Sequence, residues 1–162
     1  MNSRVTATGG QHVLHSLVAG TGNNAGLISH GVSEALSLVP FHNRNQAPLT
    51  RRVLSGASIH ASLNRRIVIH ELREVRAEQR NYCDPHSHDF VEVNLLLTTT
   101  RLRYEVRLGD DIYFVDAPAS IHIPAGLVHS ANVFEGSGFF IALLDTVKYS
   151  ASTVPGLRSQ IR

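Results

Sequence analysis

Short runs of apolar residues that alternate with polar ones dominate the chain from about residue 51 onward. In one of them, Tyr104, Val106 and Leu108 alternate with charged residues. A period of two is typical of a β-strand with one buried face. Turn-forming Gly, Pro, Asn and Asp residues separate the runs. Together these patterns predict strands over residues 57–63, 67–75, 88–97, 102–108, 112–115, 120–123, 130–134 and 139–144. Many short strands at close spacing predict an all-β sandwich or barrel.

One predicted strand differs from the others, because residues 91–97 are apolar on both parities after Glu92. A strand with this pattern is typically covered on both faces. In a small barrel, the outer face of such a strand is most simply covered by a second subunit. We therefore expect a homodimer.

The first fifty residues have a different pattern. They are rich in Gly, Ser, Thr and Asn and show no sustained period, apart from a short candidate helix at 33–38 with Ser33 as its N-cap. This segment is interpreted as a mobile arm, with a lid or a strand exchanged between subunits as alternatives. The expected organisation is an arm over 1–50, one barrel domain over 51–150 and a tail over 151–162.

Composition narrows the class of protein. With 162 residues, 43% hydrophobic and 17% charged, the chain is typical of a single globular domain. A formal charge of +2 gives no reason to expect a nucleic-acid partner. The single cysteine, Cys83, excludes an internal disulfide and fits a reducing compartment. No apolar run approaches the length of a membrane span, so we expect a cytoplasmic protein with no membrane partner.

Metal-binding chemistry is indicated by His86, His88 and Glu92, which have the spacing H-x-H-x3-E. On an extended chain these positions share a parity and can face one cavity. Imidazoles and a carboxylate are suitable ligands for a divalent first-row metal. His129 follows a Pro-x-Gly turn and can supply a third imidazole from a distant segment.

These two segments resemble the two conserved motifs of the cupin superfamily, and the resemblance covers roughly residues 67–145. The first motif is G-x5-H-x-H-x3,4-E-x6-G and the second is G-x5-P-x-G-x2-H-x3-N. The matching positions are His86, His88, Glu92, Pro124, Gly126 and His129. The chain departs at Thr99 and Pro118, where the motifs have glycine, and at Asn132, which falls one residue early. These departures concern turns and spacing rather than metal ligands.

The resemblance implies a cupin-type β-barrel (a double-stranded β-helix or jelly roll), here with an irregular N-terminal arm. It also implies one divalent metal per chain, held by His86, His88, Glu92 and His129. Mixed nitrogen and oxygen ligation fits Fe(II), Mn(II), Ni(II), Co(II) or Zn(II), with Fe(II) favoured here. Four protein ligands on an octahedral ion leave two positions for a substrate oxygen and for water or dioxygen.

Other residues are candidates for catalysis or substrate binding. Tyr104 is on the apolar face of its strand and is a candidate for proton transfer; the alternative is that it is a core aromatic. Glu92 is a second candidate for proton transfer, if it shifts off the metal. Asn94 has the parity of Glu92 and is a candidate substrate contact, or else a structural hydrogen-bonding residue. Phe90 and Phe114 are candidate substrate-binding walls, and Phe139 and Ile141 are interpreted as core or wall.

Three functions remain open. The favoured one is a non-haem Fe(II) oxygenase or oxidase (a dioxygenase-type oxidoreductase) acting on a small molecule. The alternative is a redox-neutral metal-dependent isomerase, epimerase, lyase or cyclase. A non-catalytic metabolite-binding cupin comes third, since no helix-turn-helix pattern accompanies the barrel as in a DNA-binding sensor.

Overall fold

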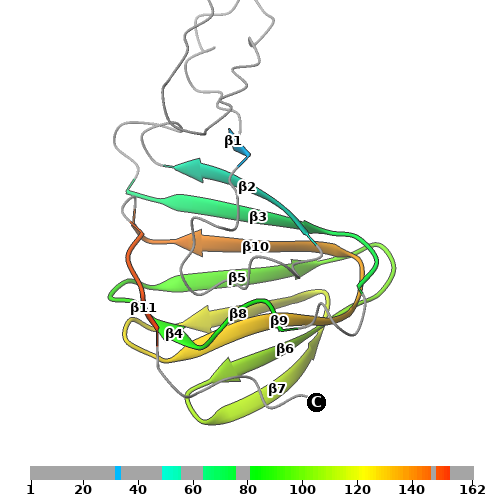
Figure 1. Ribbon diagram of the computed structural model, residues 1–162. Helices are drawn as coiled ribbons and strands as arrows, with labels where there is room; N and C mark the ends of the chain where they lie inside the picture. Colours follow the sequence, from blue (N-terminus) through cyan, green and yellow to red (C-terminus); the bar gives the residue numbers. More distant parts are fainter. Residues whose placement is uncertain (1–31, 34–48, 56–63, 76–80, 147–148, 154–162) are drawn as a thin grey trace, which may run out of the picture.

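The computed structural model describes residues 32–33, 49–55, 64–75, 81–146 and 149–153 (Figure 1). Within these ranges the chain forms eleven β-strands and no helix. The strands are β1 (Val32–Ser33), β2 (Leu49–Ser55), β3 (Arg66–Leu72), β4 (His86–Ser87), β5 (Glu92–Leu97), β6 (Leu102–Leu108), β7 (Asp111–Asp116), β8 (Ala119–Ile123), β9 (His129–Gly136), β10 (Gly138–Leu144) and β11 (Ser152–Thr153). The expected all-β class is confirmed. The same residues include no helix that is long and apolar enough to cross a membrane.

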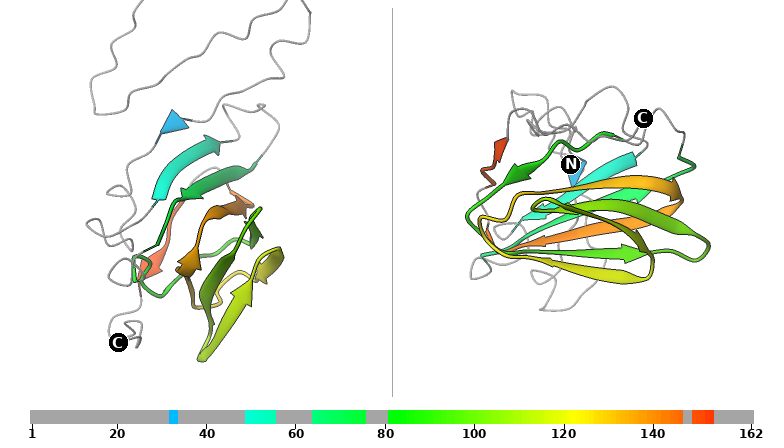
Figure 2. Two further views of the ribbon diagram at one scale, coloured as in Figure 1. Left: turned by 90° about the vertical axis from the view of Figure 1, so that its right-hand side faces the viewer. Right: turned by 90° about the horizontal axis from the view of Figure 1, so that it is seen from below.

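The strands form two antiparallel sheets that curve around a shared interior (Figures 1 and 2). One sheet has the order β1-β2-β3-β10-β5-β8 and the other β11-β4-β9-β6-β7. Neighbouring strands in each sheet are often far apart in sequence, as where β10 lies between β3 and β5. This crossing of the chain between two sheets is the jelly-roll arrangement.

The core lies between the sheets. Tyr104 and Val106 of β6 and Val133 of β9 are almost fully buried, and Leu96 and Phe140 approach them from the opposite sheet. Tyr104 stacks on Phe140 across the interior, with ring centroids 5.3 Å apart. The alternation of inward and outward residues that the sequence shows in 102–108 therefore places the inward set in the barrel core.

Strand β5 is fully buried on one face only in the part of the chain that the structure describes, since Val93 and Leu95 on its other face are half-buried. Glu92, Asn94 and Leu96 are buried, whereas Leu97 is 42% exposed. Leu97 is the register partner of Phe139 of β10, which is 45% exposed, so the outer face of this sheet carries neighbouring apolar side chains. The expectation of two covered faces is not met by these residues alone, and the homodimer stays a prediction.

The structure also refines the predicted strands. The run 102–108 coincides with β6, but 88–97 is divided, because residues 88–91 are a loop and β5 begins at Glu92. The sequence did not predict β2, which pairs with β3 along its whole length. Strand β2 begins at Leu49 and β11 lies at Ser152–Thr153, so the two sheets extend beyond residues 51–150 at both ends. The predicted strand 57–63 lies outside the described residues, as does the predicted helix 33–38 except for Ser33, which belongs to β1.

Candidate metal centre and its cavity

Three buried histidines meet at one end of the barrel. His86 lies on β4, His88 in the loop that follows, and His129 is the first residue of β9. Strands β4 and β9 pair where His86 is opposite His129, which joins the two motifs across 43 residues of chain. One nitrogen from each imidazole lies within 4.8 Å of the other two. The three histidines of the predicted ligand set are therefore together.

Backbone carbonyls set the tautomer of all three imidazoles. Each Nδ1 lies 2.8–2.9 Å from a carbonyl oxygen, and because a carbonyl only accepts, Nδ1 must be the protonated donor. The acceptors for His86, His88 and His129 are the carbonyls of Asp84, Phe90 and Leu127. Each Nε2 then keeps its lone pair, which is the form that binds a metal.

Glu92 lies beside these nitrogens. Its Oε2 is 2.9 Å from His88 Nε2 and 3.9 Å from His129 Nε2. When His88 is protonated at Nδ1 alone, its Nε2 and the Glu92 Oε2 both carry lone pairs and repel each other. Only a proton shared between them or a bound cation would then stabilise the contact. Neighbouring ligands about 2.1 Å from one octahedral ion lie about 3.0 Å apart. His129 Nε2 is buried and has no hydrogen-bond partner. This donor set fits a divalent first-row metal.

Burial also keeps His129 available as a ligand. The pKa of His129 is lowered, chiefly because burial disfavours the charged imidazolium, although the nearby Glu92 acts in the opposite direction. A neutral imidazole is required for metal binding. The site is therefore suited to hold a metal at pH values somewhat below those of an exposed histidine site.

The Pro-x-Gly turn fixes the relation between the two ligand-bearing segments. Gly126 has φ of 81°, in the left-handed region that favours glycine. Its N–H donates to the carbonyl of His88 at 2.7 Å. The turn that the sequence motif identifies therefore contacts the first motif directly, three residues before His129 begins β9.

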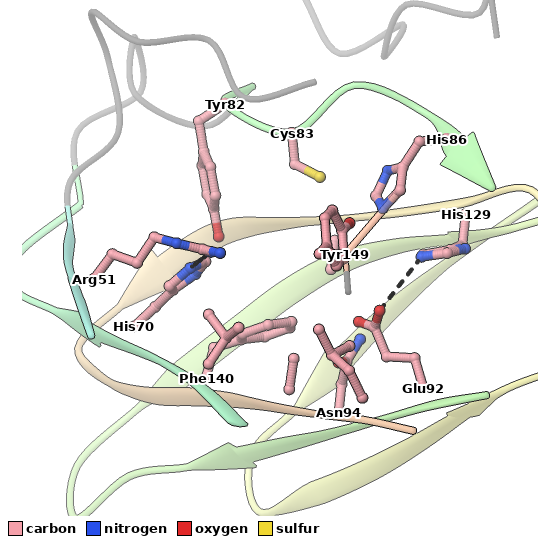
Figure 3. Close-up of a pocket in the computed structure, with 14 residues that line it drawn as sticks. Arg51, His70, Tyr82, Cys83, His86, Glu92, Asn94, His129, Phe140 and Tyr149 are labelled. Atoms are coloured by element: carbon pink, nitrogen blue, oxygen red, sulfur yellow. Dashed lines mark hydrogen bonds and ion pairs between the residues drawn. The ribbon is translucent and has the colours of Figure 1, made fainter. Parts of the chain in front are cut away.

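A small cavity of about 50 Å³ opens from this centre into the barrel. Figure 3 shows His86, His129 and Glu92 on one side and Arg51 with His70 on the other. The lining residues are Arg51, Val68, His70, Tyr82, Cys83, His86, Glu92, Asn94, His129, Ala131, Phe140, Ala142, Leu144 and Tyr149. His88 lies behind this wall, and its ring stacks on Phe90 with centroids 3.9 Å apart and planes within 4°.

The other candidate residues fall into different places. Asn94 lines the cavity, and its role as a substrate contact stays a prediction. Tyr104 is fully buried but does not line it. The Tyr104 hydroxyl lies 3.4 Å from that of Tyr82, which lines the cavity, so Tyr104 is one residue removed from it. Phe90 does not line the cavity but stacks on His88, and so orients this imidazole.

Phe114 lies away from the cavity. It is on the edge strand β7, is 55% exposed, and packs edge-on against Phe134. No strand covers that edge among the described residues, and Ile112 and Tyr113 of β7 are exposed as well, whereas Val115 packs against the core. Phe139 and Ile141 also point outward, whereas Phe140 and Ala142 line the cavity. The sequence analysis placed Phe139 and Ile141 in the core or cavity wall, and this was wrong, because the neighbouring residues of β10 face inward.

Sequence reasoning missed four polar lining residues: Arg51, His70, Tyr82 and Tyr149. The strand containing His70 carried a usable signal, because His70 is the polar position on the face it shares with Val68 and Leu72. Nothing in the sequence distinguishes Arg51 from the neighbouring Arg52, which is exposed.

Cys83 is expected to be inert towards alkylating reagents in the folded protein. Burial raises the pKa of its thiol to about 12, so the reactive thiolate is scarce at pH 8. Modification by iodoacetamide, followed by mass spectrometry, should be more than roughly 100-fold slower in buffer than in guanidinium chloride. Equal rates in the two solvents would show that Cys83 is accessible and ionised, contrary to this structure.

Comparisons with known proteins agree with the fold. No protein-family model matches the chain, and no curated protein matches it significantly. Oxalate decarboxylase from Bacillus subtilis at pH 4.6 matches with a TM-score of 0.52 and 18% identity, over 78% of this chain and 32% of that one. A structure from work on the Mn(II) centres of the same enzyme matches with a TM-score of 0.50 and 20% identity, over 76% and 31%.

The matched enzyme is a cupin protein, so the chain described here has the cupin fold. Its three-histidine group fits a cupin metal site, as the sequence motifs predicted. The chain spans about a third of the length of the oxalate decarboxylase chains that it matches. At this level of identity the likeness concerns the fold alone.

Proposed function

We propose that the protein is a metal-dependent enzyme that acts on a small molecule bound in the barrel cavity. The observation that carries this proposal is the convergence of three Nε2 lone pairs and the Glu92 carboxylate at one end of that cavity. His86, His88, Glu92 and His129 would hold the metal. A divalent ion there would supply a Lewis acid or, as Fe(II), a centre for dioxygen chemistry.

The protein's own residues would bind and orient the substrate. Burial raises the pKa of Tyr82 and of Tyr149 far above the ordinary range, so both phenols stay protonated and donate hydrogen bonds to substrate oxygen atoms. Asn94 adds an amide between the metal ligands and the far wall. The apolar walls formed by Phe140 and Leu144 exclude bulk water, which strengthens these polar contacts.

The first candidate reaction is that of a non-haem Fe(II) oxygenase or oxidase, which the mixed nitrogen and oxygen donor set supports. The second is a redox-neutral reaction, such as that of a lyase or isomerase. Its support is the fold shared with a Mn(II)-containing decarboxylase. Two further expectations belong to the proposal: a cytoplasmic location, supported by the single cysteine, and a homodimer, supported by the exposed pair Leu97 and Phe139.

Metal content and oxygen dependence test this function. Anaerobic reconstitution with Fe(II) or Mn(II) is expected to give about one ion per chain by elemental analysis. Oxygen uptake by the Fe(II) protein is then measured with a panel of small organic acids, next to product formation under anaerobic Mn(II) loading. Uptake coupled to substrate loss supports the oxygenase, and turnover without oxygen supports the redox-neutral enzyme.

The site itself has a separate control. Less than about 0.2 ion per chain after reconstitution would contradict a metal centre. Metal at full occupancy without turnover of any small molecule would favour the third hypothesis, a metabolite-binding cupin.

A further inference from the structure

A buried arginine occupies the end of the cavity opposite the metal ligands. Arg51 comes from β2, lines the cavity and is 6% exposed. In Figure 3 its guanidinium points from the far wall towards the interior, where Tyr149 and Asn94 lie. The next residue, Arg52, is exposed on the other face of the same strand. Arg51, unlike Arg52, therefore faces the cavity, which is large enough for a small ligand.

His70 holds this guanidinium in place. Arg51 Nη1 lies 2.8 Å from His70 Nε2, and since arginine only donates, Nε2 is the acceptor. Arg51 and His70 are register partners on β2 and β3. The imidazole is itself fixed by stacking on Phe140, with centroids 5.4 Å apart. The cation is thus fixed by packing before any ligand arrives, which reduces the entropy lost on binding.

Asn94 gives an independent indication of a ligand. It is 1% exposed, lines the cavity, and neither its Oδ1 nor its Nδ2 has a hydrogen-bond partner. A buried amide without partners destabilises the folded chain. A ligand that accepts from Nδ2 or donates to Oδ1 would satisfy it. Asn94 is on the same face of β5 as Glu92 and lies beside it in Figure 3.

Cavity size and charge restrict the ligand. A volume of about 50 Å³ holds about three to five water-sized groups. Among the described lining residues Glu92 is the only acid, and it lies at the metal end. The opposite end offers a guanidinium, whose planar donors match a carboxylate. The two ends therefore select a short molecule with an anionic group at one end and a metal-binding oxygen at the other.

We propose that the cavity binds a short carboxylate of about two to four carbons, a 2-oxo acid, a 2-hydroxy acid or a dicarboxylate. Its carboxylate pairs with Arg51, its second oxygen function faces the metal ligands, and Asn94 bonds the ligand between them. The orientation rests on the proposed function, whereas the pairing with Arg51 does not require a metal.

Isothermal titration calorimetry with matched probes tests this substrate class. Pyruvate, lactate and oxalate are titrated into the Mn(II)-loaded and the metal-free protein, next to pyruvamide, lactamide and oxamide. We expect the acids to bind and the amides not to bind. Arg51→Gln should weaken binding of the acids by roughly 10- to 100-fold, the loss of a hydrogen-bonded charge, whereas Arg52→Gln should leave it unchanged. Both variants should keep the metal content of the parent.

Equal binding of acids and amides, no binding of any acid, or an unchanged affinity in a folded Arg51→Gln protein would overturn the inference. Metal-free protein separates this result from the proposed function. Loss of metal binding with Arg51-dependent acid binding intact would contradict the metal enzyme and support the carboxylate site. Full metal content without acid binding would support the metal centre and contradict the carboxylate site.

Asn94→Leu covers the case in which Arg51→Gln does not fold. Leucine has a similar shape and removes the unpartnered amide, so this variant should unfold at a higher temperature than the parent. It should nevertheless bind the acids more weakly. Parent-like affinity in Asn94→Leu would show that the amide does not contact the ligand, and would overturn the inferred arrangement.

Discussion

Replacing His129 with alanine is expected to remove the metal while leaving the barrel folded. His129 supplies a buried Nε2 that has no hydrogen-bond partner and faces Glu92 at 3.9 Å. Dividing the binding free energy of a structural metal site among four ligands gives a loss of roughly 100- to 1000-fold in affinity for one ligand. The strands of both sheets, by contrast, are joined by ladders and a core in which the ligands take little part.

His122→Ala is the matched control, because His122 lies next to the second motif but is exposed on β8. Elemental analysis and circular dichroism of the two variants give the result. A chelator should lower the melting temperature of the parent and of His122→Ala, since bound metal stabilises the folded state. It should not change that of His129→Ala. Metal retained in His129→Ala would show the ligand set to be wrong, and loss of the fold would show the site to be structural.

The close approach of His86, His88 and Glu92 was predictable because the three residues are near one another in the sequence. The spacing of His86, His88 and Glu92 limits how far apart their side chains can lie, whatever the fold. The three side chains meet although they do not share one continuous strand, because His88 lies in the loop between β4 and β5. The sequence offers His129 as a third imidazole and the resemblance adds it to the set, but its place depends on strand pairing, because β9 sets it opposite His86 of β4 and Leu108 of β6.

The other half of the cavity depends on register, which the sequence does not specify. Arg51 and Arg52 are adjacent, and only the pairing of β2 with β3 decides which one faces His70. Phe139 and Phe140 pose the same difficulty, because β10 is apolar on both parities. A shift of one residue exchanges the two faces of a strand. Residues of this kind were therefore missed or assigned to the wrong face.

The departure of Asn132 from the motif spacing has a structural reason. His129, Ala131 and Val133 share one face of β9, whereas Asn132, one residue earlier than the motif position, is on the other. There its Oδ1 accepts from the N–H groups of Tyr82 and Cys83 at 2.9 and 2.8 Å, and its Nδ2 donates to the Cys83 carbonyl at 2.9 Å. The side chain thus fixes the segment that leads into His86.

Asn132→Ala is accordingly expected to have the largest effect on stability. It leaves two N–H groups and one carbonyl of a buried segment without this partner, at a cost of about 3 kcal/mol or more. For a domain of this size that corresponds to a loss of about 6–12 °C in melting temperature. Ser130→Ala, on the same face of β9 and also buried, should change stability much less.

Two measurements distinguish loss of this anchor from a general loss of packing. Denaturant unfolding gives the change in free energy, and iodoacetamide labelling of Cys83 reports whether its segment has been released. Release should speed labelling under native conditions, and it should also weaken metal binding, because His86 follows the same segment into β4. A free energy within about 0.5 kcal/mol of the parent, with Cys83 still inert, would mean that β4 and its pairing with β9 position His86 without Asn132.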